Sequence, residues 1–289
     1  MQRIKIEIQR AANQFRGPCK EWIRNCVEEA SGIPLLRSFQ SKQEYVGSHD
    51  NISAAFFKEA AWFIDISYIS YLTGYALALK GNTTWSVICI YYSNFYSANA
   101  LLRFRFNSIT RIKGQGIFEV SFKPNDFPTF KIRKCGPSQS HDYLWNFYYK
   151  LWKGIMGLNN LYNPIISPPA SEYHFERNFR SRINYSPGEG FGEFKSIKKS
   201  NKWSPIGSPV IYQFNPTANE LLKLEAYSVG RLRMALLIES EAIKNISSRS
   251  SFNLVIRQKI AERFSGGDSK LKKKFSELLF VEPQEILSS

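Results

Sequence analysis

The chain has 289 residues, of which 43% are hydrophobic, so it can bury a substantial core and global disorder is excluded. Its formal net charge is +15, an excess that favours phosphate-rich partners or anionic membrane surfaces. We expect nucleic acid to be the partner; the alternative is that the charge only keeps the protein in solution.

The first 47 residues are mixed in composition. They predict a helix at about residues 19–30, which ends where Gly32 and Pro34 interrupt the pattern. We therefore expect residues 1–47 to be an N-terminal lead-in helix or arm, separate from the main domain.

Residues 51–106 predict two long helices joined at residues 80–82. Gly81 suits a helix stop because glycine tolerates positive φ, and Thr83 or Thr84 is positioned to cap the next helix. Aromatic and aliphatic residues recur at three- and four-residue steps in the second helix, which is the period of one helix stripe. So short a connection makes the helices antiparallel, and we expect the rest of the chain to pack on this pair.

This helix pair also raises the question of a membrane segment, because residues 66–79 and 83–102 carry no charge. Several Ser, Thr and Asn side chains lie in the second helix and Asp65 interrupts the first; such groups are expensive in lipid. We expect a buried helix pair in a soluble protein, with a membrane hairpin as the alternative.

After residue 106 the pattern changes to alternation. Residues 117–122 and 129–133 predict a β-hairpin with a wide turn, whose aromatic side chains are expected to pack on the helices rather than stack bases. A third strand is expected at residues 209–214 because two strands alone are marginal. Helices are expected at residues 140–157, at 171–185, from Thr217 onward and at 252–264.

The expected fold class is mainly α: a helical-bundle core built on the long αα-hairpin, with a small β-ribbon insertion. We place the helical domain at residues 48–265, the β insertion at 110–135 and a basic C-terminal tail at 266–289.

The four cysteines are scattered, with no CxxC pair, and the three histidines show no zinc spacing. The beginning of the sequence contains no uninterrupted apolar segment of the kind found in secretion signals. We therefore expect a cytoplasmic protein with no metal and no cofactor.

Common catalytic signatures such as a P-loop, a Rossmann glycine fingerprint or HExxH are not found in the sequence. The most unusual local chemistry is at residues 172–185, where three arginines lie within two helical turns. Arginine donates a fork of hydrogen bonds to phosphate, and several arginines around one phosphodiester stabilise charge that develops during cleavage. A neighbouring His or Tyr would transfer the proton. The candidate catalytic residues are Arg177, Arg180, Arg182, His174 and Tyr185. The alternative is a solvated helix face with salt bridges to Glu172 and Glu176.

Other polar and basic residues are candidates for nucleic-acid binding through sequence-independent attraction to phosphates. The alternative is that these basic runs are merely solvated. The candidates are Asn178, Asn184, Lys195, Lys198, Lys199, Lys202, Lys272 and Lys273.

An aromatic second helix, followed by an Arg-rich helix that ends Arg182-Ile183-Asn184-Tyr185, resembles the HEPN superfamily. The resemblance implies an all-α, typically dimeric protein; the family includes metal-independent RNases of toxin–antitoxin and antiviral systems. Active members place an Arg, a polar residue and then a His after four to six intervening residues. Arg177-Asn178 matches the beginning of that motif, but neither Arg177 nor Arg180 is followed by a His at that spacing.

The resemblance implies an RNA-directed protein of a prokaryotic defence or toxin–antitoxin system, acting as a metal-independent endoribonuclease. A homodimer and a protein partner encoded nearby are expected with it. The alternative is a non-catalytic dimerising scaffold that binds nucleic acid or an acidic protein, which the missing histidine favours.

Overall fold

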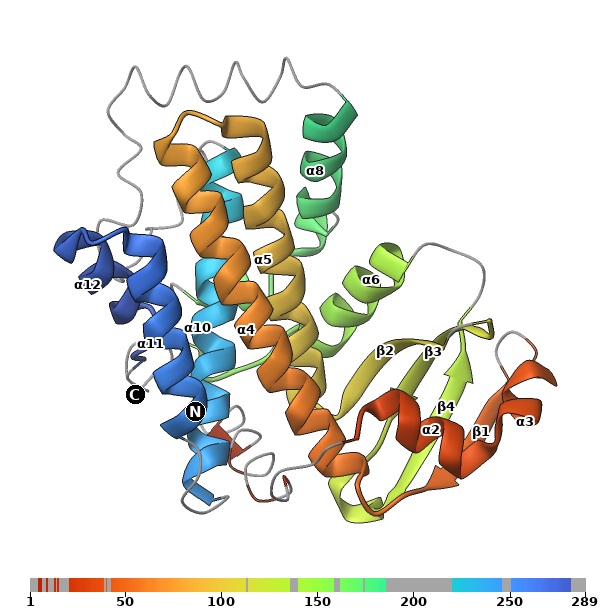
Figure 1. The fold of residues 1–289 in the computed structure, drawn as a ribbon. Helices are drawn as coiled ribbons and strands as arrows, with labels where there is room; N and C mark the ends of the chain where they lie inside the picture. Colours follow the sequence, from red (N-terminus) through yellow and green to blue (C-terminus); the bar gives the residue numbers. More distant parts are fainter. Residues whose placement is uncertain are drawn as a thin grey trace.

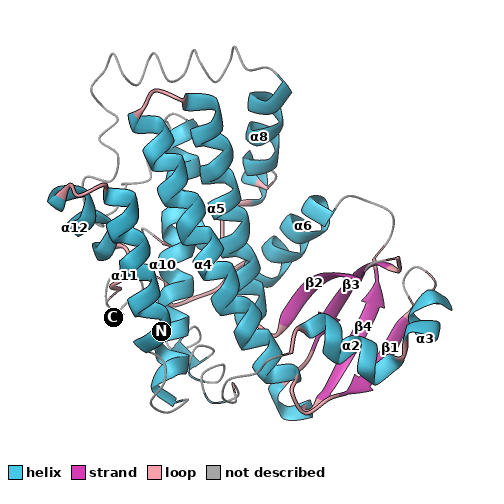
Figure 2. Cartoon of the chain, in the orientation of Figure 1, coloured by secondary structure: helices cyan, strands magenta, loops and turns pink. Residues whose placement is uncertain are grey.

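The computed structural model describes residues 5–6, 9, 13, 15, 21–38, 40, 43–112, 114–135, 140–158, 162–173, 175–185, 220–245 and 251–281. Within these residues the protein is mostly helical and has a four-stranded antiparallel sheet at one end (Figures 1 and 2). The expected mainly α fold with a small β element is confirmed at this level. The third strand expected at residues 209–214 lies outside the described residues.

The two helices expected between residues 51 and 106 are α4 (Ile52–Leu79) and α5 (Thr83–Phe104). Gly81 in the turn between them has a φ of 78°, the conformation that favours glycine after a helix. The expected cap by Thr83 or Thr84 is wrong, because Asn82 is the N-cap residue, and its side chain makes no capping hydrogen bond.

Small residues bring α4 and α5 close together. The Ser67 hydroxyl lies 2.6 Å from that of Ser97 and donates to the Ser93 carbonyl at 2.8 Å. Nearer the turn, the Ser86 hydroxyl donates to the carbonyl of Gly74 at 2.6 Å. A Cβ at position 74 would lie 2.9 Å from the Ser86 carbonyl oxygen, so the close approach there requires glycine.

The aromatic stripe of α5 is only partly buried. Trp85 is 60% exposed, and Tyr92 and Phe95 are half-buried, whereas Leu102 is fully buried. On α4, Trp62 is 46% exposed. The helix pair therefore has rings on both sides: Tyr68, Tyr71 and Tyr91 are buried, whereas Trp62 and Trp85 are exposed.

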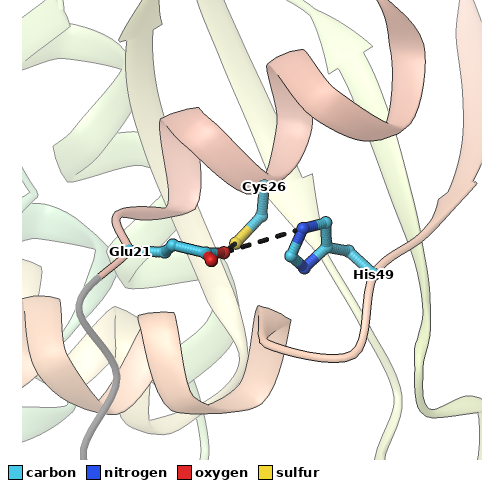
Figure 3. A group of neighbouring side chains, drawn as sticks. All are labelled: Glu21, Cys26 and His49. Atoms are coloured by element: carbon cyan, nitrogen blue, oxygen red, sulfur yellow. Dashed lines mark hydrogen bonds and ion pairs between the residues drawn. The ribbon is translucent and has the colours of Figure 1, made fainter.

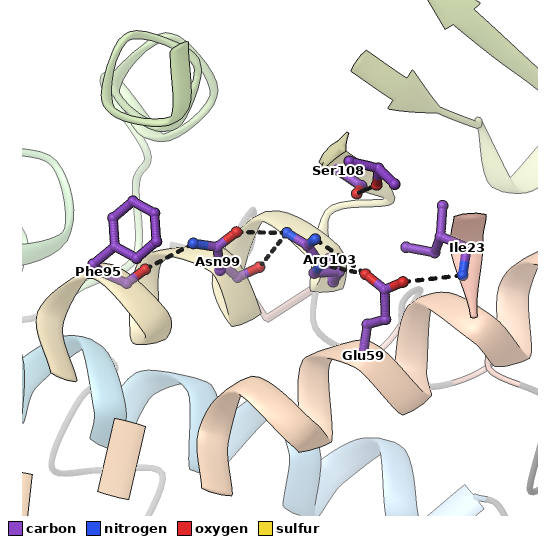
Figure 4. A network of polar contacts seen from close by, with 7 residues as sticks. Ile23, Glu59, Phe95, Asn99, Arg103 and Ser108 are labelled. Atoms are coloured by element: carbon purple, nitrogen blue, oxygen red, sulfur yellow. Dashed lines mark hydrogen bonds and ion pairs between the residues drawn. The ribbon is translucent and has the colours of Figure 1, made fainter. Parts of the chain in front are cut away.

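A buried polar network joins α2 (Ile23–Ser31) to the two long helices (Figure 4). Arg103 donates from Nε and Nη2 to Oε2 of Glu59 at 3.1 and 3.0 Å, and from Nη1 to Oδ1 of Asn99 at 2.8 Å. The other carboxylate oxygen of Glu59 accepts the backbone N–H of Ile23 at 3.0 Å. Asn99 is thus a buried polar group with hydrogen-bond partners, as expected from the sequence.

The sheet contains β1 (Glu44–Ser48), β2 (Asn107–Ile112), β3 (Gly116–Ser121) and β4 (Thr129–Lys134), in the order β1-β4-β3-β2. The expected β-hairpin corresponds to β3 and β4, which are joined through the short helix η1 (Pro124–Asp126). Phe118, Val120, Phe130 and Ile132 are buried, so the sheet packs its aromatic face into the core as expected. Strand β1 pairs with β4, although residues 44–47 were expected to lie outside the helical domain. Helix α3 (Ile33–Ser38) follows α2.

The other helices are α6 (Ser140–Trp152), α7 (Asn163–Ile166), η2 (Ala170–Glu172), α8 (Phe175–Tyr185), α10 (Glu220–Asn245), α11 (Ser251–Ser265) and α12 (Ser269–Glu277). Helix α10 lies against α4 and α5 (Figure 1). All of its residues from 224 to 239 are buried.

Helix α12 contains the basic run of residues 270–274 that we placed in a tail. Asp268 caps α12 by accepting the backbone N–H groups of Lys270 and Leu271. Phe275 is buried, and the Tyr68 hydroxyl donates to its carbonyl at 2.8 Å. This basic segment is therefore attached to the body of the protein.

Among the described residues, no helix combines the length and the apolar character needed to cross a bilayer.

Candidate functional site

The three arginines of α8 have different surroundings. Arg177 Nη1 lies 2.8 Å from Oδ1 of Asp142, in the first turn of α6. The Arg180 guanidinium lies 5.9 Å from the ring centre of Tyr91 on α5. Arg182 is exposed and lies over the ring of Phe179 at 5.5 Å. The structure thus directs Arg177 and Arg180 toward α6 and α5, while Arg182 packs against its own helix.

A histidine from another helix lies in this region. His141, in the first turn of α6, stacks on Phe95 with ring centres 4.4 Å apart. Its Nδ1 lies 2.9 Å from the hydroxyl of Tyr91, and that hydroxyl also accepts the indole N–H of Trp145 at 3.4 Å. A histidine, a tyrosine and an arginine therefore meet where α5, α6 and α8 come together.

The protonation states of these groups follow from their burial and neighbours. Burial, together with the positive charge of Arg180, lowers the pKa of His141 below its usual 6.5, so the ring is neutral at pH 7. Burial raises the pKa of Tyr91 to about 12, so its hydroxyl remains protonated. When His141 Nδ1–H donates to the Tyr91 oxygen, Nε2 presents its lone pair and can accept a proton. Nε2 makes no hydrogen bond to the described residues.

Arg180 supplies the positive charge of the site. Its side chain is half-buried, and Nε has no hydrogen-bond partner among the residues that the structure describes. The neighbouring carboxylates are engaged elsewhere, because Asp142 pairs with Arg177 and Glu176 pairs with Arg231. A partly desolvated guanidinium of this kind attracts an anion strongly.

A buried ion pair fixes α8 in place beneath this site. Glu176 is fully buried; its Oε1 lies 2.6 Å from Arg231 Nη1 on α10, and its Oε2 accepts the Tyr149 hydroxyl at 2.5 Å. Although burial opposes the charged form, the interactions with Tyr148, Glu176 and Tyr149 outweigh it and raise the pKa of Arg231. The alternative that Glu176 pairs with the solvated arginines of its own helix is therefore wrong.

Asn94 on α5 belongs to the same cluster. Its Oδ1 accepts a hydrogen bond from Arg231 Nη1 at 2.9 Å. The expectation of a buried, hydrogen-bonded amide is therefore confirmed for the amide oxygen. Its Nδ2 is buried without a hydrogen-bond partner in the described part of the chain. The guanidinium of Arg231 is itself enclosed by the rings of Trp145, Tyr148 and Tyr227, at 5.2, 4.7 and 4.8 Å.

The other expected site residues fall into three groups. Asn178 is exposed on α8, and Asn184 and Tyr185 belong to its last turn, where side-chain positions are not described. Lys272 pairs with Glu262 at 2.5 Å, and Lys273 lies 3.9 Å from Glu277. Both lysines lie on α12, on the opposite side of the α4–α5 pair from α8 (Figure 1). His174, Lys195, Lys198, Lys199 and Lys202 lie outside the described residues.

A second cluster contains metal-ligand types that the sequence had not suggested (Figure 3). Oε2 of Glu21 lies 3.5 Å from Cys26 Sγ and 3.6 Å from His49 Nε2, and Glu29 lies 3.0 Å from the same nitrogen. However, His49 Nδ1 accepts the backbone N–H of Asn51 at 3.1 Å. The neutral ring therefore carries its proton on Nε2, the atom that a metal would occupy. We interpret this cluster as a hydrogen-bonded link between α2 and the start of α4.

Sequence reasoning missed His141 and Tyr91 as site residues. Both were visible as members of aromatic helices, but no local spacing connects them to Arg180. Comparisons with family models, with curated proteins and with solved structures gave no match. The functional interpretation therefore depends on the geometry of the site.

Proposed function

We propose that the protein is a HEPN-like, RNA-directed protein of a prokaryotic defence or toxin–antitoxin system, with the α4–α5 hairpin as its core. Its activity is metal-independent cleavage of RNA. The observation that supports this proposal is the position of His141 beside Arg180, with its ring held by Tyr91 and Phe95. In this proposal His141 of α6 takes the role of the family histidine, which α8 lacks.

The reaction is an attack of the ribose 2′ oxygen on the adjacent phosphorus. Neutral His141 accepts the 2′-hydroxyl proton at Nε2, and Arg180 stabilises the negative charge that develops on the phosphate oxygens. The bond from phosphorus to the 5′ oxygen breaks, and that oxygen takes a proton from solvent. The products are a 2′,3′-cyclic phosphate and a 5′-hydroxyl, and His141 later returns its proton to solvent.

The partners follow from the same resemblance. We propose a cytoplasmic homodimer that acts with a protein partner encoded nearby. Arg177 is a phosphate ligand in this proposal; its pairing with Asp142 orients its guanidinium toward the site.

The test is cleavage of an end-labelled, single-stranded RNA by the purified protein. Arg180→Ala and His141→Gln are each expected to lower the cleavage rate by about 100-fold or more. Arg182→Ala is the matched control, because Arg182 lies on the same helix but is exposed and packs on Phe179, and its rate should stay within a few-fold of native. If Arg180→Ala and His141→Gln cleave as fast as the native protein, the proposed site is wrong.

A second candidate function is a non-catalytic, dimerising RNA-binding subunit. The pairing of Arg177 with Asp142 favours the absence of catalysis, because a paired arginine stabilises less of the charge that develops on a phosphate during cleavage. In that case the native protein would bind RNA with a steep dependence on salt concentration and would not cleave it.

A further inference from the structure

Six rings form a continuous aromatic band across the accessible side of the helix pair. In order they are Trp22, Trp62, Phe63, Tyr96, Tyr92 and His141, and successive ring centres lie 5.5, 5.1, 6.0, 6.0 and 6.3 Å apart. The band begins just before α2, crosses α4 and α5, and ends at the candidate site on α6.

All six side chains of the band are accessible to solvent. Trp62 is 46% exposed, and the other five are half-buried. Other rings of the same helices, such as Tyr68 and Tyr71, are fully buried, whereas the rings of the band keep part of their surface in solvent. An extended set of partly exposed rings is a feature of surfaces that bind a ligand.

Positive groups lie at both ends of the band. Lys58 Nζ lies 4.0 Å from the ring centre of Trp22, and Arg180 lies at the other end beside Tyr91. A chain of rings between cations fits a strand that carries flat bases and regularly spaced phosphates. The net charge of +15 favours a polyanionic strand as the occupant of this band.

We propose that this band stacks the unpaired bases of single-stranded RNA and guides the strand to His141 and Arg180. This inference rests on the proposed function and adds the substrate class: unpaired RNA, read without strong sequence preference. Duplex RNA is excluded because its bases are already stacked and paired, so their faces cannot reach the rings.

The experiment measures binding separately from cleavage. The probe is a fluorescent uridine oligomer with 2′-O-methyl groups, which cannot form the attacking 2′ oxygen, and the readout is anisotropy. Trp62→Leu and Tyr96→Leu should each weaken binding about tenfold, and Tyr96→Phe should retain native affinity because it keeps the ring. The rings against His141 are those of Tyr91, Tyr92 and Phe95, so variants at Trp62 and Tyr96 test the band rather than the site.

The matched control is Phe280→Leu, because Phe280 is also an exposed ring (54%) but follows α12 on the other side of the helix pair. It should bind the oligomer as the native protein does. A duplex of the same length should bind the native protein weakly and should be insensitive to Trp62→Leu and Tyr96→Leu.

The outcomes separate the two proposals. If Trp62→Leu and Tyr96→Leu weaken binding but the native protein never cleaves RNA, RNA binding by the band is supported and the proposed catalysis is wrong. If native cleavage depends on Arg180 while both variants bind normally, the band is wrong and the catalysis stands. If the variants instead convert an oligomer to a monomer with unchanged RNA affinity, the band is a self-association surface and the inference is overturned.

Discussion

The Tyr91 hydroxyl lies 2.9 Å from Nδ1 of His141, although 50 positions separate the two residues in the sequence. This contact fixes the orientation of the imidazole and, when Nδ1–H donates, selects the tautomer whose Nε2 lone pair is available. A histidine that serves as a base needs such a partner, because its two nitrogens exchange roles when the proton moves.

Tyr91→Phe should therefore lower the cleavage rate about tenfold, because the imidazole loses the group that selects its tautomer. The ring of Phe keeps the stacking, so the melting temperature should change little. Measurements of kcat and KM should show the loss mainly in kcat. An unchanged kcat would contradict the positioning role of Tyr91.

The pH dependence of cleavage should report the lowered pKa of His141. Cleavage requires the neutral ring of His141, so the cleavage rate should rise with pH. The acid limb of the pH–rate profile should have its midpoint below pH 6.5. Asp142 raises this pKa, so Asp142→Asn should move the midpoint to still lower pH. A pH–rate profile of both proteins checks this; an acid limb centred above 6.5 would exclude His141 as the base.

The lowered pKa of His141 also predicts how the stability of the protein depends on pH. Because the folded pKa of His141 is lower than the unfolded value of 6.5, the unfolded state binds more protons as the pH falls. The contribution of His141 to the free energy of unfolding is therefore fully present above pH 6.5. It is lost as the pH falls through the pKa of His141 in the folded protein. Urea unfolding should be measured for the native protein and for His141→Gln at several pH values. The difference between their free energies of unfolding should shrink as the pH falls from 6.5 through the folded pKa of His141.

Local patterns were enough to predict several parts of the fold. The glycine at position 81 marked the end of α4, and the aromatic residues Phe118 and Phe130 of the predicted hairpin pack into the core from β3 and β4. These features depend on the backbone preferences of single residues and on the period of a strand, which are properties of short segments. They need no knowledge of how the elements pack.

The site could not be predicted in the same way, because it depends on which sides of the helices meet. Glu176 lies within a turn of Arg177 and Arg180 and resembled a surface ion-pair partner, yet it points inward to Arg231. The aromatic stripe of α5 suggested a packed face, but Trp85 is exposed, and Ser86, Ser93 and Ser97 lie in the packed face beside larger buried residues. Small residues at helical spacing were the signal that could have shown this, since they allow close helix contact.

The buried pair of Glu176 and Arg231 should contribute strongly to folding. Arg231→Met should lower the free energy of unfolding by about 3–5 kcal/mol, because it leaves the Glu176 carboxylate buried without its counter-charge. The double variant Glu176→Gln with Arg231→Met should lose less than Arg231→Met alone, because neither charge remains. Urea unfolding monitored by circular dichroism measures both values.

An exposed pair provides the control for this comparison. Lys244 lies 2.6 Å from Glu241, and the lysine side chain is 66% exposed. Lys244→Met should change the free energy of unfolding by at most about 0.5 kcal/mol, since water screens such a pair. Equal losses for Arg231→Met and Lys244→Met would show that Glu176 and Arg231 are not buried together.

The close contact of α4 and α5 at Gly74 gives a prediction whose sign depends on packing. In an exposed helix, Gly→Ala stabilises by about 1 kcal/mol because alanine is the better helix former. At position 74 the added methyl would lie 2.9 Å from both Ile90 Cγ1 and the Ser86 carbonyl oxygen, so the helices would have to separate. Gly74→Ala should therefore lower the free energy of unfolding by about 1–3 kcal/mol. A stabilised variant in urea unfolding would mean that the two helices do not approach each other so closely, and that the aromatic side of the pair is not fixed in the way the RNA-binding band requires.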